Sequence, residues 1–119
     1  MNVLAGILLA SASLHITVWP NGAGHVPVRD YTLRCVPTGG TLPQPASACT
    51  KLAALAAPFA PTPSGVACTQ IYGGPQEALV TGRFRDRVVH ARFTRKNGCE
   101  IARWSRVRFL FPGTVASTH

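Results

Sequence analysis

The chain has 119 residues, 46% of them hydrophobic, which suits one folded domain with an apolar core and excludes a disordered chain. Its formal net charge is +8, and nine of its twelve Lys and Arg residues lie within residues 83–108. A surface this basic can attract nucleic acid, an acidic polymer or an acidic protein, whereas no segment is apolar over enough length to cross a membrane.

Residues 1–12 have two interpretations. Residues 3–10 are apolar, and Ala10-Ser11-Ala12 has the small-x-small form of a signal-peptidase site. Under the first interpretation residues 1–12 are a signal-peptide remnant, the protein is secreted and extracellular, and residues 13–119 form its single domain. The stretch lacks a basic leading region, so the start of such a signal would lie upstream. Under the second interpretation it is an apolar N-terminal arm of the mature domain.

The first half of the chain predicts two strands and one main helix. Residues 14–19 have the pattern of a strand that ends at the turn signal Pro20-Asn21-Gly22, and residues 31–36 that of a second strand. A helical pattern then begins at Ser47, a good capping residue, and ends before Pro58. Three side chains of this region should face the sheet: Leu52, Leu55 and Phe59.

The next part of the chain predicts a hairpin and a short helix. Residues 77–84 and 87–93 have strand patterns and should pair through a turn at Arg85-Asp86. Asn97-Gly98 is a further turn signal, and residues 99–103 should form a short helical turn after it.

The end of the chain predicts one more strand, over residues 106–111. Val107, Phe109 and Phe111 alternate with other residues there, as a strand with one buried face requires. The predicted fold class is therefore α+β: an antiparallel β-sheet of about five strands with one main helix and one short helix.

Four cysteines predict two disulfides, which often supplement the core of a small secreted domain. They are Cys35, Cys49, Cys68 and Cys99. The sequence leaves three pairings open, of which one closes two separate loops. No Cys-x-x-Cys pair occurs and no cysteine has a histidine at ligand spacing, so we expect neither a metal site nor a cofactor.

Residues 14–111 resemble the Streptomyces subtilisin inhibitor family, whose members are secreted inhibitors of serine proteases. The resemblance rests on the order and spacing of the four cysteines and on several motifs. These are Leu14-His15-Ile16-Thr17-Val18, Thr32-Leu33-Arg34-Cys35, Ser47-Ala48-Cys49-Thr50-Lys51-Leu52-Ala53-Ala54, Cys68-x-x-x-Tyr72, Cys99-Glu100-Ile101 and Phe109-Leu110-Phe111.

The resemblance implies a disulfide pairing, a reactive bond and partners. The pairing is Cys35–Cys49 with Cys68–Cys99, and the reactive bond, which the protease attacks, is Gln70–Ile71. The expected partners are a serine protease of the subtilisin type and a second copy of the chain, in a homodimer. The expected protease-contact loop consists of Ala67, Cys68, Thr69, Gln70, Ile71 and Tyr72.

The chain departs from the family pattern at three places in this loop. Thr69 stands where proline is typical, which leaves the backbone less restricted. Gln70 stands where Met, Lys or Arg is commoner, and a glutamine lacks the charge that trypsin selects, so we expect weak inhibition of trypsin. Gly73-Gly74-Pro75 carries one extra residue after Tyr72.

The sequence also bears on two other functions. Catalysis is not expected, because the histidines and carboxylates are scattered and no Gly-x-Ser-x-Gly motif occurs. The alternative to inhibition is a basic module that binds a polyanion or nucleic acid through residues 83–108, with Phe84 and Trp104 interleaved among the arginines. Disulfides and an export signal argue against a nucleic-acid partner.

Overall fold

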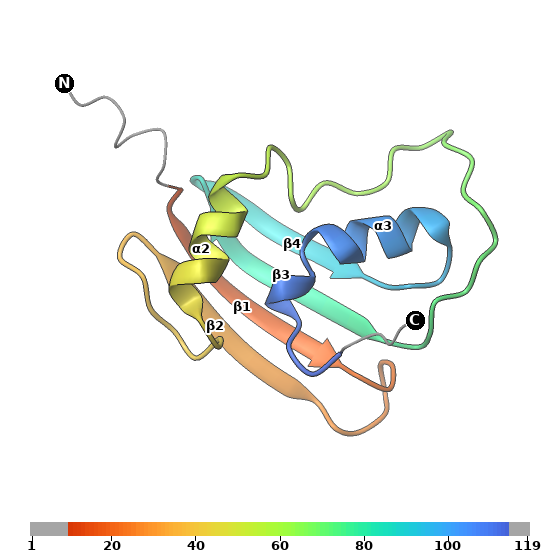
Figure 1. Ribbon diagram of the computed structural model, residues 1–119, viewed down its shortest axis with the longest axis horizontal. Helices are drawn as coiled ribbons and strands as arrows, with labels where there is room; N and C mark the ends of the chain where they lie inside the picture. The colour runs from red at the N-terminus through yellow and green to blue at the C-terminus, as the bar shows by residue number, and fades with distance from the viewer. Residues whose placement is uncertain (1–9, 115–119) are drawn as a thin grey trace.

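The structure, a computed structural model, describes residues 10–114 and has one antiparallel sheet with helices on one face (Figure 1). The strands are β1 (Ala12–Trp19), β2 (Arg29–Cys35), β3 (Glu77–Phe84) and β4 (Arg87–Phe93), in the order β2-β1-β3-β4. The helices are α2 (Pro45–Ala53), α3 (Gly98–Arg106) and the short 3-10 helix η1 (Arg108–Leu110). The predicted α+β class is confirmed, with four strands in the described part rather than about five.

Strand β1 lies inside the sheet, paired with β2 on one side and β3 on the other. Leu14, Ile16 and Val18 are buried against the helices, while His15 is exposed on the opposite face. This alternation follows from the two-residue period of a strand. The β3–β4 hairpin turns at Arg85-Asp86, as predicted, and both of these residues have positive φ.

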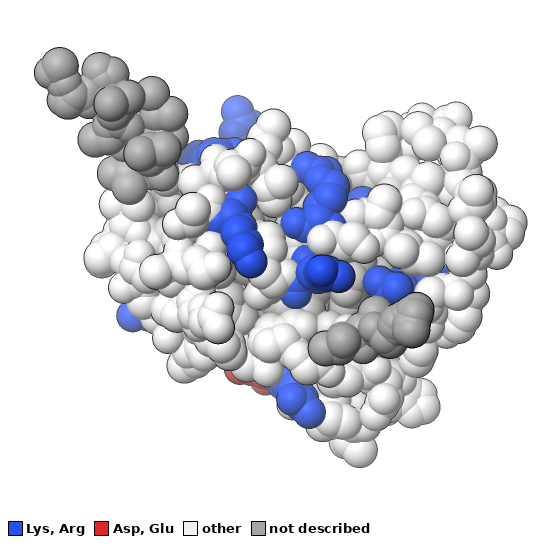
Figure 2. Space-filling view, in the orientation of Figure 1, with Lys and Arg blue, Asp and Glu red and all other residues white. Residues whose placement is uncertain are grey.

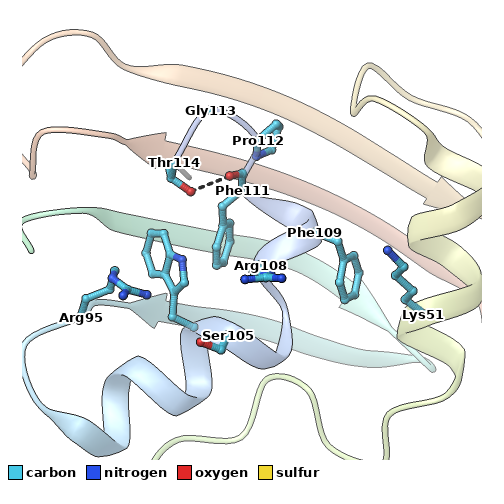
Figure 3. A pocket seen from close by; sticks show the side chains of 10 residues that line it. Lys51, Arg95, Ser105, Arg108, Phe109, Phe111, Pro112, Gly113 and Thr114 are labelled. Carbon is cyan, nitrogen blue, oxygen red and sulfur yellow. Dashed lines mark hydrogen bonds between the residues drawn. The ribbon is translucent and has the colours of Figure 1, made fainter. Parts of the chain in front are cut away.

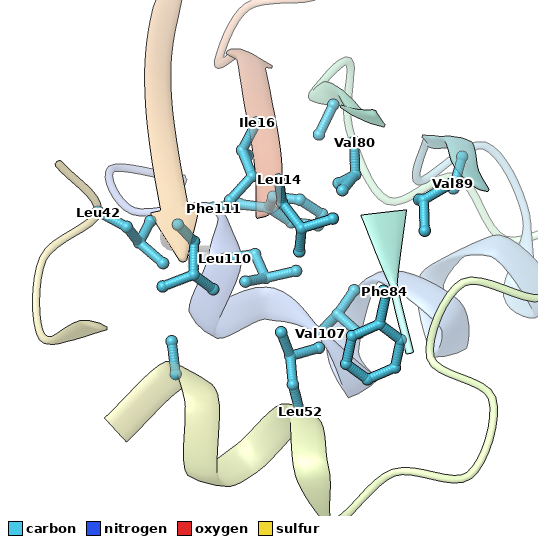
Figure 4. Close-up of a cluster of buried hydrophobic side chains, with 14 of the residues drawn as sticks. Leu14, Ile16, Leu42, Leu52, Val80, Phe84, Val89, Val107, Leu110 and Phe111 are labelled. Carbon is cyan, nitrogen blue, oxygen red and sulfur yellow. The ribbon is translucent and has the colours of Figure 1, made fainter. Parts of the chain in front are cut away.

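The core lies between the sheet and the helices (Figure 4). Trp104 of α3 is 1% exposed, and its ring centroid lies 4.6 Å from that of Phe111. Phe111 in turn packs on Phe93 of β4, with 5.4 Å between their ring centroids. Burial of these large rings fixes α3 and η1 on the sheet, since aromatic side chains contribute much of the apolar area removed from water.

The last predicted strand, over residues 106–111, is wrong. This segment contains the end of α3 and then η1. The buried residues are Trp104, Val107, Leu110 and Phe111, at helical spacings of three and four, whereas Phe109 is only partly buried. The predicted helical turn of residues 99–103 is correspondingly longer, extending over Gly98–Arg106.

The main helix begins and ends earlier than predicted. Helix α2 starts at Pro45, whose fixed φ suits a first helical position, so Ser47 is not its cap. The preceding residue, Gln44, has φ 53° and makes no side-chain capping bond. The helix ends at Ala53, well before Pro58.

Arg85, at the tip of the hairpin, bonds to the end of this helix and to the residues that follow it. Its guanidinium donates hydrogen bonds to the carbonyl oxygens of Ala53, Leu55 and Ala56, at 3.0, 3.0 and 3.2 Å. The last carbonyl groups of a helix lack partners within it, and a fork of donors satisfies several at once.

The N-terminal boundary falls partly outside the described residues. Residues 1–9 of the expected signal remnant or arm are not described. Ala10 is 7% exposed and packs in the core, and Ala12 is the first residue of β1. The helices of residues 10–114 include none long and apolar enough to span a membrane.

We predict that Arg85→Ala lowers the free energy of unfolding by about 1 kcal/mol, because carbonyl groups at the end of α2 lose a charged donor. Arg87→Ala removes the same charge from an exposed neighbour and should change stability by less than about 0.5 kcal/mol. Urea unfolding with the disulfides intact measures both. Equal losses in the two variants would contradict the capping role.

Candidate functional site

Both disulfides have the pairing that the resemblance implies. Cys35–Cys49 joins the end of β2 to α2, with 5.7 Å between the Cα atoms. Cys68–Cys99 joins the long segment between α2 and β3 to the first turn of α3, with a Cα–Cα distance of 5.3 Å. The second bond therefore attaches the expected protease-contact loop to the helix layer.

The predicted loop, residues 67–72, lies outside any helix or strand and has an exposed tip. In Figure 1 the segment that contains it runs around the end of the molecule, away from the sheet. Gln70 is exposed, and Ile71 and Tyr72 are 60% and 67% exposed although both are large and apolar. Exposed apolar side chains next to one another are typical of a surface that binds a protein.

The upstream side of Gln70–Ile71 is attached at two points. The first is the Cys68–Cys99 bond. The second is a hydrogen bond in which the backbone N–H of Gly98 donates to the carbonyl oxygen of Thr69, at 3.0 Å. A Cβ atom at Gly98 would overlap the Thr69 hydroxyl, so any other residue here would force the Thr69 side chain to turn away.

The downstream side is attached through Gly73 and Arg95. The N–H of Gly73 donates to the carbonyl oxygen of Arg95 at 2.7 Å, and Nε of Arg95 donates to the carbonyl oxygen of Gly73 at 2.9 Å. The sequence reasoning missed Arg95, which it counted only as part of the basic region. The only sequence feature near this contact that the sequence analysis noted is the extra residue in Gly73-Gly74-Pro75.

The amide of Gln70 contacts its own loop. Its Nε2 atom donates to the carbonyl oxygen of Cys68 at 3.2 Å. A partner that took the Gln70 side chain into a pocket would have to break this bond, which frees the Cys68 carbonyl for the partner.

The elements that hold the loop begin at Asn97, the N-cap of α3. Its side-chain oxygen accepts a hydrogen bond from the backbone N–H of Glu100, at 3.0 Å. The Glu100 carboxylate in turn accepts hydrogen bonds from Thr62 and Arg103, both at 2.8 Å. Thr62 lies in the proline-rich segment that precedes the loop. Its hydrogen bond to Glu100 therefore attaches that segment to α3.

Glu100 is ionised over an extended pH range. Burial raises its pKa, but hydrogen bonds from Arg103 and Thr62 and the charges of Arg103 and Lys96 outweigh that effect. The pKa of Glu100 therefore lies below its ordinary value of 4.5.

The basic region of residues 83–108 has a largely structural role. Arg85 and Arg103 donate to backbone carbonyls, and Arg92 pairs with Glu77 at 3.2 Å. The two aromatic residues expected to stack on bases are buried: Phe84 is 5% exposed and Trp104 1% exposed. The expectation of aromatic side chains available for stacking between the arginines is therefore wrong.

Lysine and arginine side chains still spread over the helix-bearing face (Figure 2). A hollow of about 510 Å³ beside η1 has Lys51, Arg95 and Arg108 in its lining, and none of the described residues that line it is an Asp or Glu (Figure 3). This face is positively charged, although several of its guanidinium groups also bond to the fold.

The family model described as subtilisin inhibitor-like matches residues 10–97, which include the whole 67–72 loop. The chain belongs to this family. Among solved structures, Streptomyces caespitosus sermetstatin in complex with Bacillus licheniformis subtilisin is similar, at 26% identity and a TM-score of 0.53. The match covers 85% of this chain and 97% of sermetstatin. A search of curated proteins finds no match.

The resemblance recognised in the sequence is thus confirmed at the level of the family. The subtilisin inhibitor-like family gives no support to the polyanion-binding alternative, and an inhibitor family implies a protein that is not an enzyme.

We predict that the Glu100 contacts stabilise the protein at neutral pH and stop doing so in acid. Because the pKa is lowered on folding, the stabilisation is complete above the ordinary value of 4.5 and is lost as the pH falls through the folded-state value. The difference in unfolding free energy between wild type and Glu100→Gln should therefore shrink on acidification. An equal pH dependence for Asp86→Asn, which removes an exposed carboxylate, would assign the effect to net charge instead.

Proposed function

We propose that this chain inhibits serine proteases of the subtilisin type by presenting residues 67–72 as a substrate-like loop. The reactive bond is Gln70–Ile71. The observation that carries the proposal is an exposed bond attached to the β4–α3 region on both sides, through Thr69 and Gly73. Membership of the subtilisin inhibitor-like family supports it, and so does the similarity to sermetstatin, which was crystallised with subtilisin.

Inhibition follows from keeping the cleaved ends together. When the serine oxygen of the protease bonds to the Gln70 carbonyl carbon, the bond to the Ile71 nitrogen breaks and that nitrogen takes up a proton. In an ordinary substrate the new amine diffuses away and water completes hydrolysis. Here the amine stays near the acyl group, so it re-forms the peptide bond and releases the serine. A pre-ordered loop also lowers the ordering cost of binding.

The side chains at the tip select the protease. Gln70 is neutral, so it suits a broad primary pocket of the subtilisin type better than the acidic pocket of trypsin, and trypsin should be inhibited weakly. Ala67 is small and would underfill the large apolar pocket that subtilisins offer three residues upstream of Gln70. The backbone of residues 67–69 can pair with the edge of the protease substrate site whatever its side chains.

Secretion and dimerisation are further parts of the proposal. Two disulfides suit an extracellular protein, and a signal within residues 1–12 would have to end before Ala10, which packs in the core. A homodimer, which the family resemblance implies, would use the sheet face opposite the helices. That face includes Val88, which is 75% exposed. The inhibitor requires no metal or cofactor.

The test of the proposal is a titration of active-site-counted subtilisin with the oxidised protein, followed by mass spectrometry of the complex. We expect stoichiometric loss of activity and slow, partial cleavage only at Gln70–Ile71. Gln70→Lys should gain at least about tenfold in affinity for trypsin, since it adds the charge which that pocket selects. Gln70→Pro should abolish tight inhibition of both enzymes. Unchanged inhibition by both variants would place the reactive bond elsewhere.

We predict that the two disulfides differ in their effect on inhibition. Cys68→Ser with Cys99→Ser removes an attachment next to the reactive bond, so subtilisin should cleave this double variant as a substrate. Cys35→Ser with Cys49→Ser is the matched control, because it destabilises the fold away from the loop and should still inhibit below its melting temperature. Lasting inhibition by the folded Cys68/Cys99 variant would show that the Cys68–Cys99 bond is not needed to hold the cleaved ends together.

A further inference from the structure

Gly73 and Arg95 form a reciprocal pair of hydrogen bonds on the downstream side of the loop. Each residue donates one bond and accepts one, at 2.7 and 2.9 Å. The two residues are 22 positions apart in the sequence, so the contact joins the loop to the segment between β4 and α3. One of the donors is a charged guanidinium, and hydrogen bonds from charged donors are stronger than those between neutral groups.

The guanidinium of Arg95 is itself held in place. Its Cζ atom lies 5.9 Å from the centroid of the Trp104 ring, which is buried in the core. Arg95 is only partly exposed and lines one end of the hollow in Figure 3. A planar group supported on an aromatic ring loses little freedom when it forms a hydrogen bond, so Arg95 is suited to fix the Gly73 carbonyl.

Gly73 is suited to the same contact from the loop side. A Cβ atom at this position would lie 2.8 Å from Cδ1 of Ile101 and 3.2 Å from Cβ of Arg95. A side chain here would therefore force Ile101 to shift and would crowd Arg95, whereas glycine lets the backbone approach α3 and Arg95 without displacing either.

From this geometry we infer that Arg95 is the positioning residue for the leaving-group side of the reactive bond. The inference rests on the proposed function. After cleavage at Gln70–Ile71, the new amine is separated from the fixed residue Gly73 only by Ile71 and Tyr72. Two residues span at most about 7 Å, so the Arg95 contact keeps the amine close to the acyl group. The Cys68–Cys99 bond does the same for the acyl side.

The inference is tested with two variants and one control. Arg95→Ala removes the side-chain donor and its contact with Trp104 but keeps the backbone bond from the Gly73 N–H, so exchange at Gly73 shows whether the side chain is needed to hold that bond closed. Gly73→Ala pushes the loop away from Ile101 and so weakens the same contact from the other side. Arg106→Ala removes an equal charge from an exposed position of α3 and should behave as wild type.

Three quantities are measured for each protein. They are the initial inhibition of subtilisin, the rate at which protease activity returns over hours, and amide hydrogen exchange at Gly73 and Gly98 in the free protein. We expect Arg95→Ala to inhibit stoichiometrically at first. Activity should then return at least about tenfold faster than with wild type, as cleaved product accumulates, a change of about 1.4 kcal/mol. Exchange should accelerate at Gly73 and stay unchanged at Gly98.

Each other outcome overturns the inference in a distinguishable way. Unchanged exchange at Gly73 in both variants would show that Arg95 does not order the loop. Faster exchange with an unchanged return of activity would show that the order it supplies does not affect religation. Failure of the wild-type protein to inhibit would overturn the proposed function, and this inference with it. A general loss of folding would instead accelerate exchange at Gly98 as strongly as at Gly73.

Discussion

The placement of the segment between β4 and α3 is the constraint on which the rest of the structure depends. Burial of Trp104 fixes α3 on the sheet, and the Asn97 cap fixes where α3 begins. Arg95 of this segment, with Gly98 and Cys99 of the first turn of α3, reaches both sides of the exposed loop. A loop without regular structure is thereby attached to the packed part of the fold, where close packing of large aromatic rings opposes displacement.

Arginine side chains satisfy the irregular backbone of this protein. Residues 54–76 contain no helix or strand, so their carbonyl groups lack the partners that regular structure would supply. Three guanidinium groups take that role: Arg85 at the end of α2, Arg103 at Ala60 and Arg95 at Gly73. Part of the high positive charge is therefore a consequence of how a small, loop-rich fold is held together, and needs no polyanionic partner to explain it.

The sequence predicted the parts of the fold in which a single pattern dominates. Alternation placed β1, β2 and the β3–β4 hairpin to within two residues. It failed over residues 106–111, where alternating Val107, Phe109 and Phe111 compete with the helical spacing that buries Leu110. The loop and the disulfide pairing came from the family resemblance. The Arg95 contact could not be predicted, because an arginine that bonds to a distant carbonyl has the same sequence pattern as one that is solvated.

Attachment by tertiary contacts has a consequence for specificity. Proline at position 69 would restrict the loop through its own backbone, whereas Thr69 relies on the hydrogen bond from Gly98. Rigidity therefore resides in residues that a bound protease does not need to touch, and the exposed side chains of Gln70, Ile71 and Tyr72 carry little of it. Under the proposed function, substitutions at the tip would change which protease is bound while the attachments on both sides keep the cleaved ends together. Selection of the target and resistance to cleavage are thus physically separate properties of the same loop.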